Sequence, residues 1–137
     1  MGLGKRLTVL AMSAALAVVG GIAGAVPASA AAPQSARLFI TPSDDHPGYY
    51  NVVVSGHFST TRADTTIGMR LKGDDPWFND DLGVWRTGHA RYGDFSLHAL
   101  VWGGVLNEDW EGRDEIFAWV DSSTGWSTNT PNVNGYY

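Results

Sequence analysis

Acidic side chains are concentrated in two short windows of this chain. Nine of the fourteen Asp and Glu residues fall between Asp74 and Asp81 or between Glu108 and Glu115, four in the first window and five in the second. Calcium in proteins binds about six to eight oxygen atoms from carboxylates, carbonyls and water, and clustered short acids supply them well. The two windows therefore predict a calcium site. Its candidate ligands are Asp74, Asp75, Asp80, Asp81, Glu108, Asp109 and Asp114.

Solvated surface loops are the alternative interpretation of the same acids. Neither window has the spacing of an EF-hand loop. Adjacent acids such as Asp74 and Asp75 point to opposite sides of an extended chain, so only one of the two is expected to bind a shared ion. A common site also requires both windows to leave the same end of the fold.

Each acidic window also contains a tryptophan, Trp77 in the first and Trp110 in the second. Burial is the commoner fate of this side chain, and a buried ring would anchor its loop on the core. An exposed ring could instead stack on a sugar or on a partner surface. Trp77 and Trp110 are therefore the candidate ligand-binding residues.

Apolar and polar residues alternate with a period of two on both sides of these windows, which is typical of half-buried strands. The predicted strands cover residues 37–41, 49–58, 67–72, 82–86, 94–101, 116–121 and 126–133. No convincing helical period is present. The pattern predicts an all-β fold, an antiparallel β-sandwich of about seven strands. The residues expected to share its core are Val52, Val54, Met69, Leu71, Leu97, Ala99, Ile116 and Ala118.

The strand arrangement resembles immunoglobulin-like and fibronectin-type domains in outline, and residues 114–118 are similar to their penultimate strand. Position 117 is a phenylalanine, which lacks the hydroxyl of a tyrosine corner. Two acidic loops on a β-sandwich also resemble a C2-type calcium-dependent domain. These resemblances imply a sandwich and leave the ligand open.

The first thirty residues have the three parts of a secretory signal peptide. Lys5 and Arg6 precede an apolar stretch over 7–26, and Ala28-Ser29-Ala30 is a small-residue cleavage site. We expect cleavage after Ala30, export, and one domain over residues 31–137 with no membrane attachment after signal removal. Loss of Lys5 and Arg6 changes the net charge from −5 to about −7, which disfavours nucleic acid and anionic lipid as partners.

An enzyme is not expected from the arrangement of chemically capable residues. The four histidines show no metal-binding spacing, and there is no Gly-rich phosphate loop or nucleophile elbow. Asp94, Ser96 and His98 share one face of a predicted strand. However, residues four apart on a strand are roughly 13 Å apart, so Asp94 cannot orient His98.

The sequence thus predicts a small secreted binding or structural domain, stabilised by calcium if the acidic windows converge. The first alternative is a carbohydrate-binding module, which aromatic residues aligned on one exposed sheet face would favour. The second is a protein-interaction or inhibitor domain, which a rigid protruding loop would favour. Its partner is expected to be an extracellular glycan or protein.

Overall fold

The computed structural model describes residues 33–77, 79–107 and 112–137. The predicted signal peptide and the candidate residues Glu108, Asp109 and Trp110 lie outside this part of the chain. Eight strands and one short helix form in the described residues. They are β1 (Ser35–Pro42), β2 (Tyr49–His57), β3 (Asp64–Asp74), β4 (Asn79–Arg91), β5 (Asp94–Trp102), α1 (Gly103–Leu106), β6 (Asp114–Ser122), β7 (Ser127–Asn129) and β8 (Val133–Gly135).

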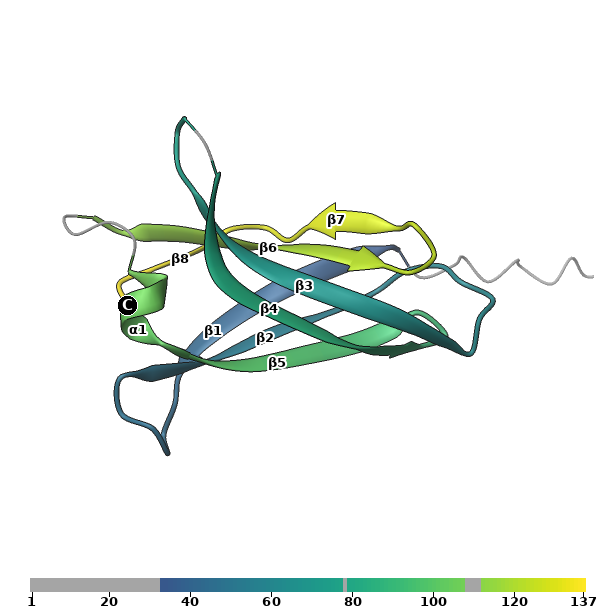
Figure 1. The fold of residues 1–137 in the computed structure, drawn as a ribbon, viewed down its shortest axis with the longest axis horizontal. Coiled ribbons are helices and arrows are strands. Elements are labelled where there is room, and N and C mark those ends of the chain that lie inside the picture. Colours follow the sequence, from purple (N-terminus) through teal and green to yellow (C-terminus); the bar gives the residue numbers. More distant parts are fainter. Residues whose placement is uncertain (1–32, 78, 108–111) are drawn as a thin grey trace, which may run out of the picture.

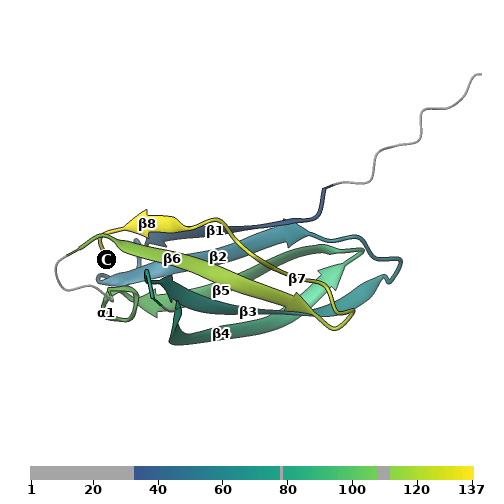
Figure 2. The same cartoon turned by 90° about the horizontal axis from the view of Figure 1, so that it is seen from above.

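All pairings between these strands are antiparallel, in the order β1-β2-β5-β4-β3-β6-β7, with β8 also paired to β6. The sheet curls until β1 lies against β6, β7 and β8 (Figures 1 and 2). The all-β prediction is confirmed in this coarse form. The fold is a nearly closed, barrel-like sheet of eight strands rather than the predicted two-sheet sandwich of about seven.

The β4–β5 turn is the reason why the sheet stays continuous. Tyr92 and Gly93 both have positive φ angles, of 50° and 89°, as the tightest hairpin turns require. Arg91 and Asp94 pair directly across the turn, and the two strands then diverge. A sandwich and a curled sheet both bury every second residue of a strand. The alternation of apolar residues in the sequence therefore could not distinguish the two folds.

The core lies inside the curled sheet. All eight residues predicted to share it are buried, which confirms that part of the sequence analysis. Phe58 and Trp126 stack at one end, with ring centroids 4.9 Å apart. At the other end, Tyr137 meets Tyr50 edge to face, and Leu106 of α1 is fully buried.

No helix within 33–77, 79–107 or 112–137 has the length and apolarity that crossing a membrane requires. α1 is four residues long.

Candidate ligand-binding site

Three consecutive positions across β4, β3 and β6 form a row on the outer surface of the sheet. Trp85 of β4 pairs with Arg70 of β3, and Arg70 pairs on its other side with Trp119 of β6. Asn129 of β7 extends the row because it pairs with Trp119. Directly opposite residues of antiparallel strands project from the same face, so these four side chains share one surface, which we call the Trp85–Asn129 row.

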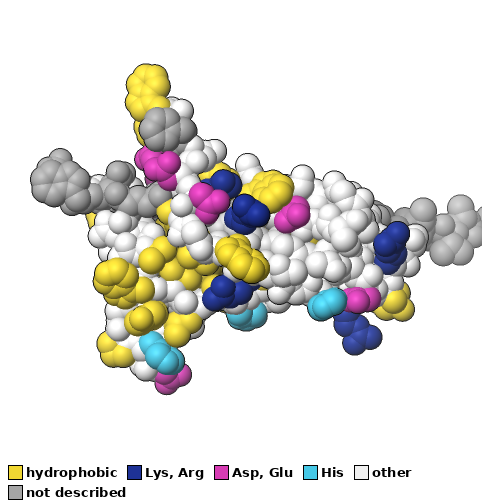
Figure 3. Space-filling model, viewed as in Figure 1, with side chains coloured by type: hydrophobic (Ala, Val, Ile, Leu, Met, Phe, Trp, Pro, Cys, Tyr) yellow, Lys and Arg dark blue, Asp and Glu magenta, His cyan; other side chains and the backbone are white. Residues whose placement is uncertain are grey.

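Burial confirms that this face is the outer one. The neighbours Met69 and Ala118 are buried in the core, whereas Arg70 is exposed and Trp119 is half-buried. Trp85 has 64% of its surface exposed. Figure 3 shows hydrophobic and basic side chains intermingled over this part of the molecule.

A second row lies beside the first and contains Asp81, Lys72 and Phe117, again from β4, β3 and β6. Phe117 also projects outward, yet only 4% of it is exposed. Its ring therefore forms part of the floor of this surface rather than part of the core. Together the two rows place apolar rings and polar groups on one face.

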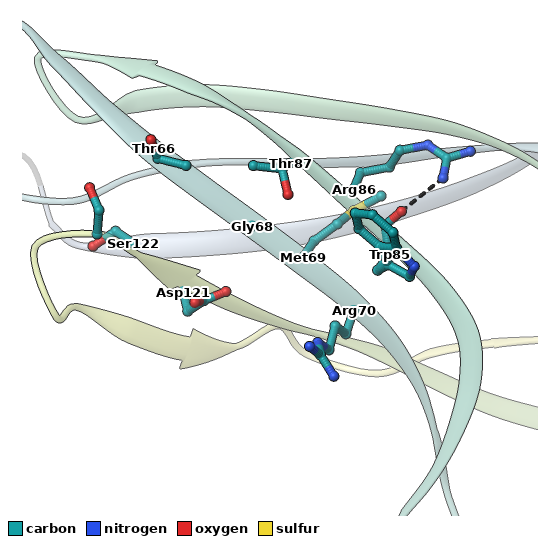
Figure 4. Close-up of a pocket in the computed structure, with 10 residues that line it drawn as sticks. Thr66, Gly68, Met69, Arg70, Trp85, Arg86, Thr87, Asp121 and Ser122 are labelled. Carbon is teal, nitrogen blue, oxygen red and sulfur yellow. Dashed lines mark hydrogen bonds between the residues drawn. The ribbon is translucent and has the colours of Figure 1, made fainter.

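Two hollows lie on this surface and share Arg70. The larger has a volume of about 410 Å³ and is lined by Arg70, Lys72, Asn79, Phe117, Trp119 and Asn129. The smaller, of about 280 Å³, runs from Arg70 and Trp85 at one end to Thr66 and Ser122 at the other (Figure 4). A ligand lying along the face would therefore meet Arg70 at the junction of the two hollows.

The charged groups of this face differ in how far they are neutralised. Lys72 Nζ lies 3.8 Å from Asp81 Oδ2. Arg86 donates a hydrogen bond of 2.8 Å to the Trp85 carbonyl (Figure 4). Among the described residues, none of the ion pairs includes Arg70. The Arg70 guanidinium is thus the cation on this face with the most free bonding capacity.

The β3–β4 hairpin rises from the sheet (Figure 1). The register between β3 and β4 shifts between Arg70 and Lys72, and such irregularities bend a strand pair. Asn79, which pairs with Asp74 next to the turn of the hairpin, lines the larger hollow. Trp77 lies beyond it with 90% of its surface exposed, so of the two fates considered for this residue the structure shows the exposed one.

The described parts of the two acidic windows lie at the same end of the fold. Gly73, near the end of β3, pairs with Ile116, near the beginning of β6. This meets the topological condition for a shared ion. However, the described residues contain no group of three or more acids and histidines that could hold a metal ion.

The acids of the predicted calcium site have different surroundings. Asn132 donates a hydrogen bond to Asp74, and the Gly83 amide donates one of 2.9 Å to Asp81. Asp75 is half-buried, Asp80 is exposed and Asp114 is buried. Since Glu108 and Asp109 lie outside the described residues, the calcium site stays a prediction.

The polar residues of β5 form contacts of their own. Ser96 Oγ lies 3.0 Å from His98 Nε2 on the outer face of the strand. Asp94 is engaged by another histidine, with 2.7 Å between its Oδ1 and His57 Nδ1. The three residues considered as a catalytic set are therefore divided between two separate contacts.

The Trp85–Asn129 row was not predicted from the sequence. One signal was present, because Phe117 and Trp119 occupy the outward positions of a strand whose other positions fill the core. Large aromatic residues on the outward side of an alternating strand suggest a binding surface. Arg70 and Trp85 give no such signal until the strand register is known.

Comparison with known proteins does not assign the chain to a family. No family model, no curated protein and no solved structure matches it. The functional interpretation therefore rests on the geometry of the outer face of β4, β3, β6 and β7.

Proposed function

We propose that this protein is a secreted glycan-binding domain that binds sugar rings on the outer face of β4, β3, β6 and β7. The observation that carries the proposal is the alignment of Trp85 and Trp119 on either side of Arg70. Aligned aromatic residues on one exposed sheet face are the arrangement that the sequence analysis associated with a carbohydrate-binding module.

The chemistry of the row suits a sugar. A pyranose ring has an apolar C–H face that packs on an indole ring, while its hydroxyls need hydrogen-bonding partners around the rim. Tryptophan provides a large rigid apolar surface at low cost in conformational entropy. The amide of Asn129 and the guanidinium of Arg70 lie next to the rings and provide the polar partners.

The spacing of the row suits a chain of sugars. Trp85 and Trp119 are separated by two interstrand steps, which places their backbones roughly 10 Å apart. Two rings at that separation can each hold one sugar of a short oligosaccharide. The hollows on either side of Arg70 continue the surface and let a longer chain lie across it.

A protein-binding function is the second candidate, because the β3–β4 hairpin protrudes from the sheet (Figure 1). Trp77 is the most exposed of the large hydrophobic side chains described. An exposed tryptophan on a protruding hairpin suits insertion into a pocket of a partner protein. The glycan proposal is stronger because it uses several aligned side chains rather than one.

Calcium remains a proposed stabiliser rather than a participant in sugar binding. The support for it is the common location of the two acidic windows at one end of the sheet. Such an ion would hold the β3–β4 hairpin and the segment before β6 together by neutralising their acids.

A polysaccharide-binding assay tests the glycan proposal. The purified protein is run through native gels that contain soluble polysaccharides of different backbone and charge, and its retardation is compared with that of a non-binding protein. We expect retardation by at least one polysaccharide. Unchanged mobility with a broad panel, together with capture by a protein partner that depends on Trp77, would support the second candidate instead.

A further inference from the structure

We infer that the sugar bound between Trp119 and Lys72 carries a negative charge, as a uronic acid or a sulfated sugar does. This inference rests on the proposed glycan-binding function and names the class of glycan. It concerns the larger hollow, the one next to the β3–β4 hairpin.

The lining of this hollow has an unusual balance of groups for so acidic a protein. Two of its side chains are cationic, two are amides and two are aromatic, and none of the six lining residues is acidic. The whole chain carries a net charge of −5. The lining itself thus holds two cations and no acid, whereas Asp81 lies beside Lys72 and Asp121 lines the smaller hollow.

Arg70 is the group that would bind the anion. It is exposed, and none of the ion pairs among the described residues includes it. The guanidinium presents a planar set of donors that matches a carboxylate or sulfate with two parallel hydrogen bonds. The Trp85 and Trp119 positions on either side restrict where a sugar ring can lie, and so place its charged substituent near Arg70.

Lys72 would contribute less than Arg70. Its Nζ atom already lies 3.8 Å from an Asp81 carboxylate oxygen, which offsets part of its charge. An ammonium is also a compact, strongly hydrated charge that lacks the fork geometry of arginine. The two cations should therefore differ in their effect on binding, with Arg70 dominant.

The size and surroundings of the hollow are consistent with one charged sugar. A volume of about 410 Å³ lies near the lower end of the range for small-ligand sites, about 300–1,000 Å³. The exposed acids Asp74 and Asp80 lie on the neighbouring hairpin. They would repel an anionic chain that extended towards the hairpin.

Matched pairs of polysaccharides test the inference. Polygalacturonate is compared with its methyl-esterified form, which has the same backbone without the charge, and dextran sulfate is compared with dextran. Titration calorimetry with the full protein gives the affinity for each. We expect one charged member to bind at least about tenfold more tightly than its neutral partner, as charge-assisted hydrogen bonds predict. The pair that shows the preference distinguishes a carboxylate ligand from a sulfate ligand.

Three variants identify which cation produces the preference for the charged polysaccharide. Arg70→Gln should abolish the preference for the charged member, and Lys72→Gln should reduce it by a smaller factor. Arg62→Gln removes the same charge from an exposed position in the connection between β2 and β3, and should leave the preference intact. Thermal melts of the three variants verify that each one is folded.

The outcomes separate this inference from the function on which it rests. Tight binding of a neutral polysaccharide that Trp85→Ala weakens and Arg70→Gln leaves unchanged would overturn the inference and retain the function. Binding of charged polysaccharides that Trp85→Ala does not weaken would mean simple ion exchange and overturn both. An equal loss of preference in Arg62→Gln and Arg70→Gln would also overturn the inference.

Discussion

Arg70 of β3 and Trp119 of β6 are directly opposite each other on paired strands and project from the same outer face. The neighbours Leu71 and Ala118 are also paired, and both are fully buried. A single register thus places one pair in the core and the next pair on the proposed binding surface. The fold itself therefore fixes the separation of the Arg70 and Trp119 backbones.

Two half-buried tryptophans should respond differently to truncation. Trp126 stacks on Phe58 at the end of the core, so Trp126→Ala should lower the free energy of unfolding by about 3–5 kcal/mol. Trp119 projects away from the core, and Trp119→Ala should lower it by less while it removes glycan binding. Urea unfolding of both variants measures the difference. Equal losses of stability would show that Trp119 is a core residue rather than a binding residue.

Two glycines with similar backbone angles should differ in their tolerance of a side chain. A Cβ atom at Gly125, where φ is 90°, would meet nothing within 4 Å, so Gly125→Ala should cost only the left-handed backbone penalty of about 1–2 kcal/mol. A Cβ atom at Gly93, where φ is 89°, would lie 1.9 Å from the Phe58 carbonyl oxygen. Gly93→Ala should therefore be clearly the more destabilising variant in thermal or urea unfolding. A Gly93→Ala protein as stable as Gly125→Ala would contradict the described β4–β5 turn.

The phenol of Tyr137 should make the fold sensitive to alkaline pH. Burial raises the pKa of Tyr137 above its ordinary value of 10.0, and the negative charge of Asp114 raises it further. The folded state then keeps this proton in a pH range where the unfolded chain loses it. The contribution is fully present below about pH 10 and falls as the pH rises through the folded-state pKa.

Tyr137→Phe should consequently lose less stability between pH 9 and pH 11 than the unsubstituted protein. Unfolding in urea at a series of pH values measures this. Tyr136→Phe is the matched control, because Tyr136 is 77% exposed and its hydroxyl has little protein around it. An identical effect of the two substitutions would rule out the burial of Tyr137 as the cause.

The proposed calcium site predicts a higher melting temperature in calcium. An ion that binds only the folded state adds about 2.7 kcal/mol at a hundredfold excess over its dissociation constant, which corresponds to a rise of about ten degrees or more for a domain of this size. Melts in EDTA and in millimolar calcium measure the shift. Asp75→Asn should reduce it, and Asp45→Asn, in the β1–β2 turn, should not. Identical midpoints with and without calcium would leave the acids as solvated loops.

Local alternation was sufficient to predict the core of this fold from its sequence. Met69 and Leu71, or Ile116 and Ala118, are separated by one polar or outward residue, and that spacing forces them to one face of any strand. The closure of the sheet was not predictable in this way, because it depends on the Tyr92–Gly93 turn and on how far β4 and β5 remain paired beyond it.

Local sequence patterns could not predict the binding face either, because it too depends on how distant strands pair. Arg70, Trp85 and Trp119 belong to three strands, and only the nonlocal register brings them into one row. The register shift after Arg70 also changes which residue of β4 meets each residue of β3. Acidic windows attract notice in a sequence because their residues are adjacent, whereas a binding row across strands is dispersed along the chain.

The affinity of one glycan for the Trp85→Ala and Trp102→Ala variants tests the central proposal most directly. Both side chains are exposed to a similar degree, 64% and 57%, but Trp102 lies on β5, away from the Trp85–Asn129 row. Titration calorimetry uses the polysaccharide that most strongly retards the unsubstituted protein. We predict that Trp85→Ala weakens binding at least about tenfold, as loss of an aromatic anchor does, while Trp102→Ala binds normally. Normal binding by Trp85→Ala, or an equal loss in both variants, would contradict the proposed function.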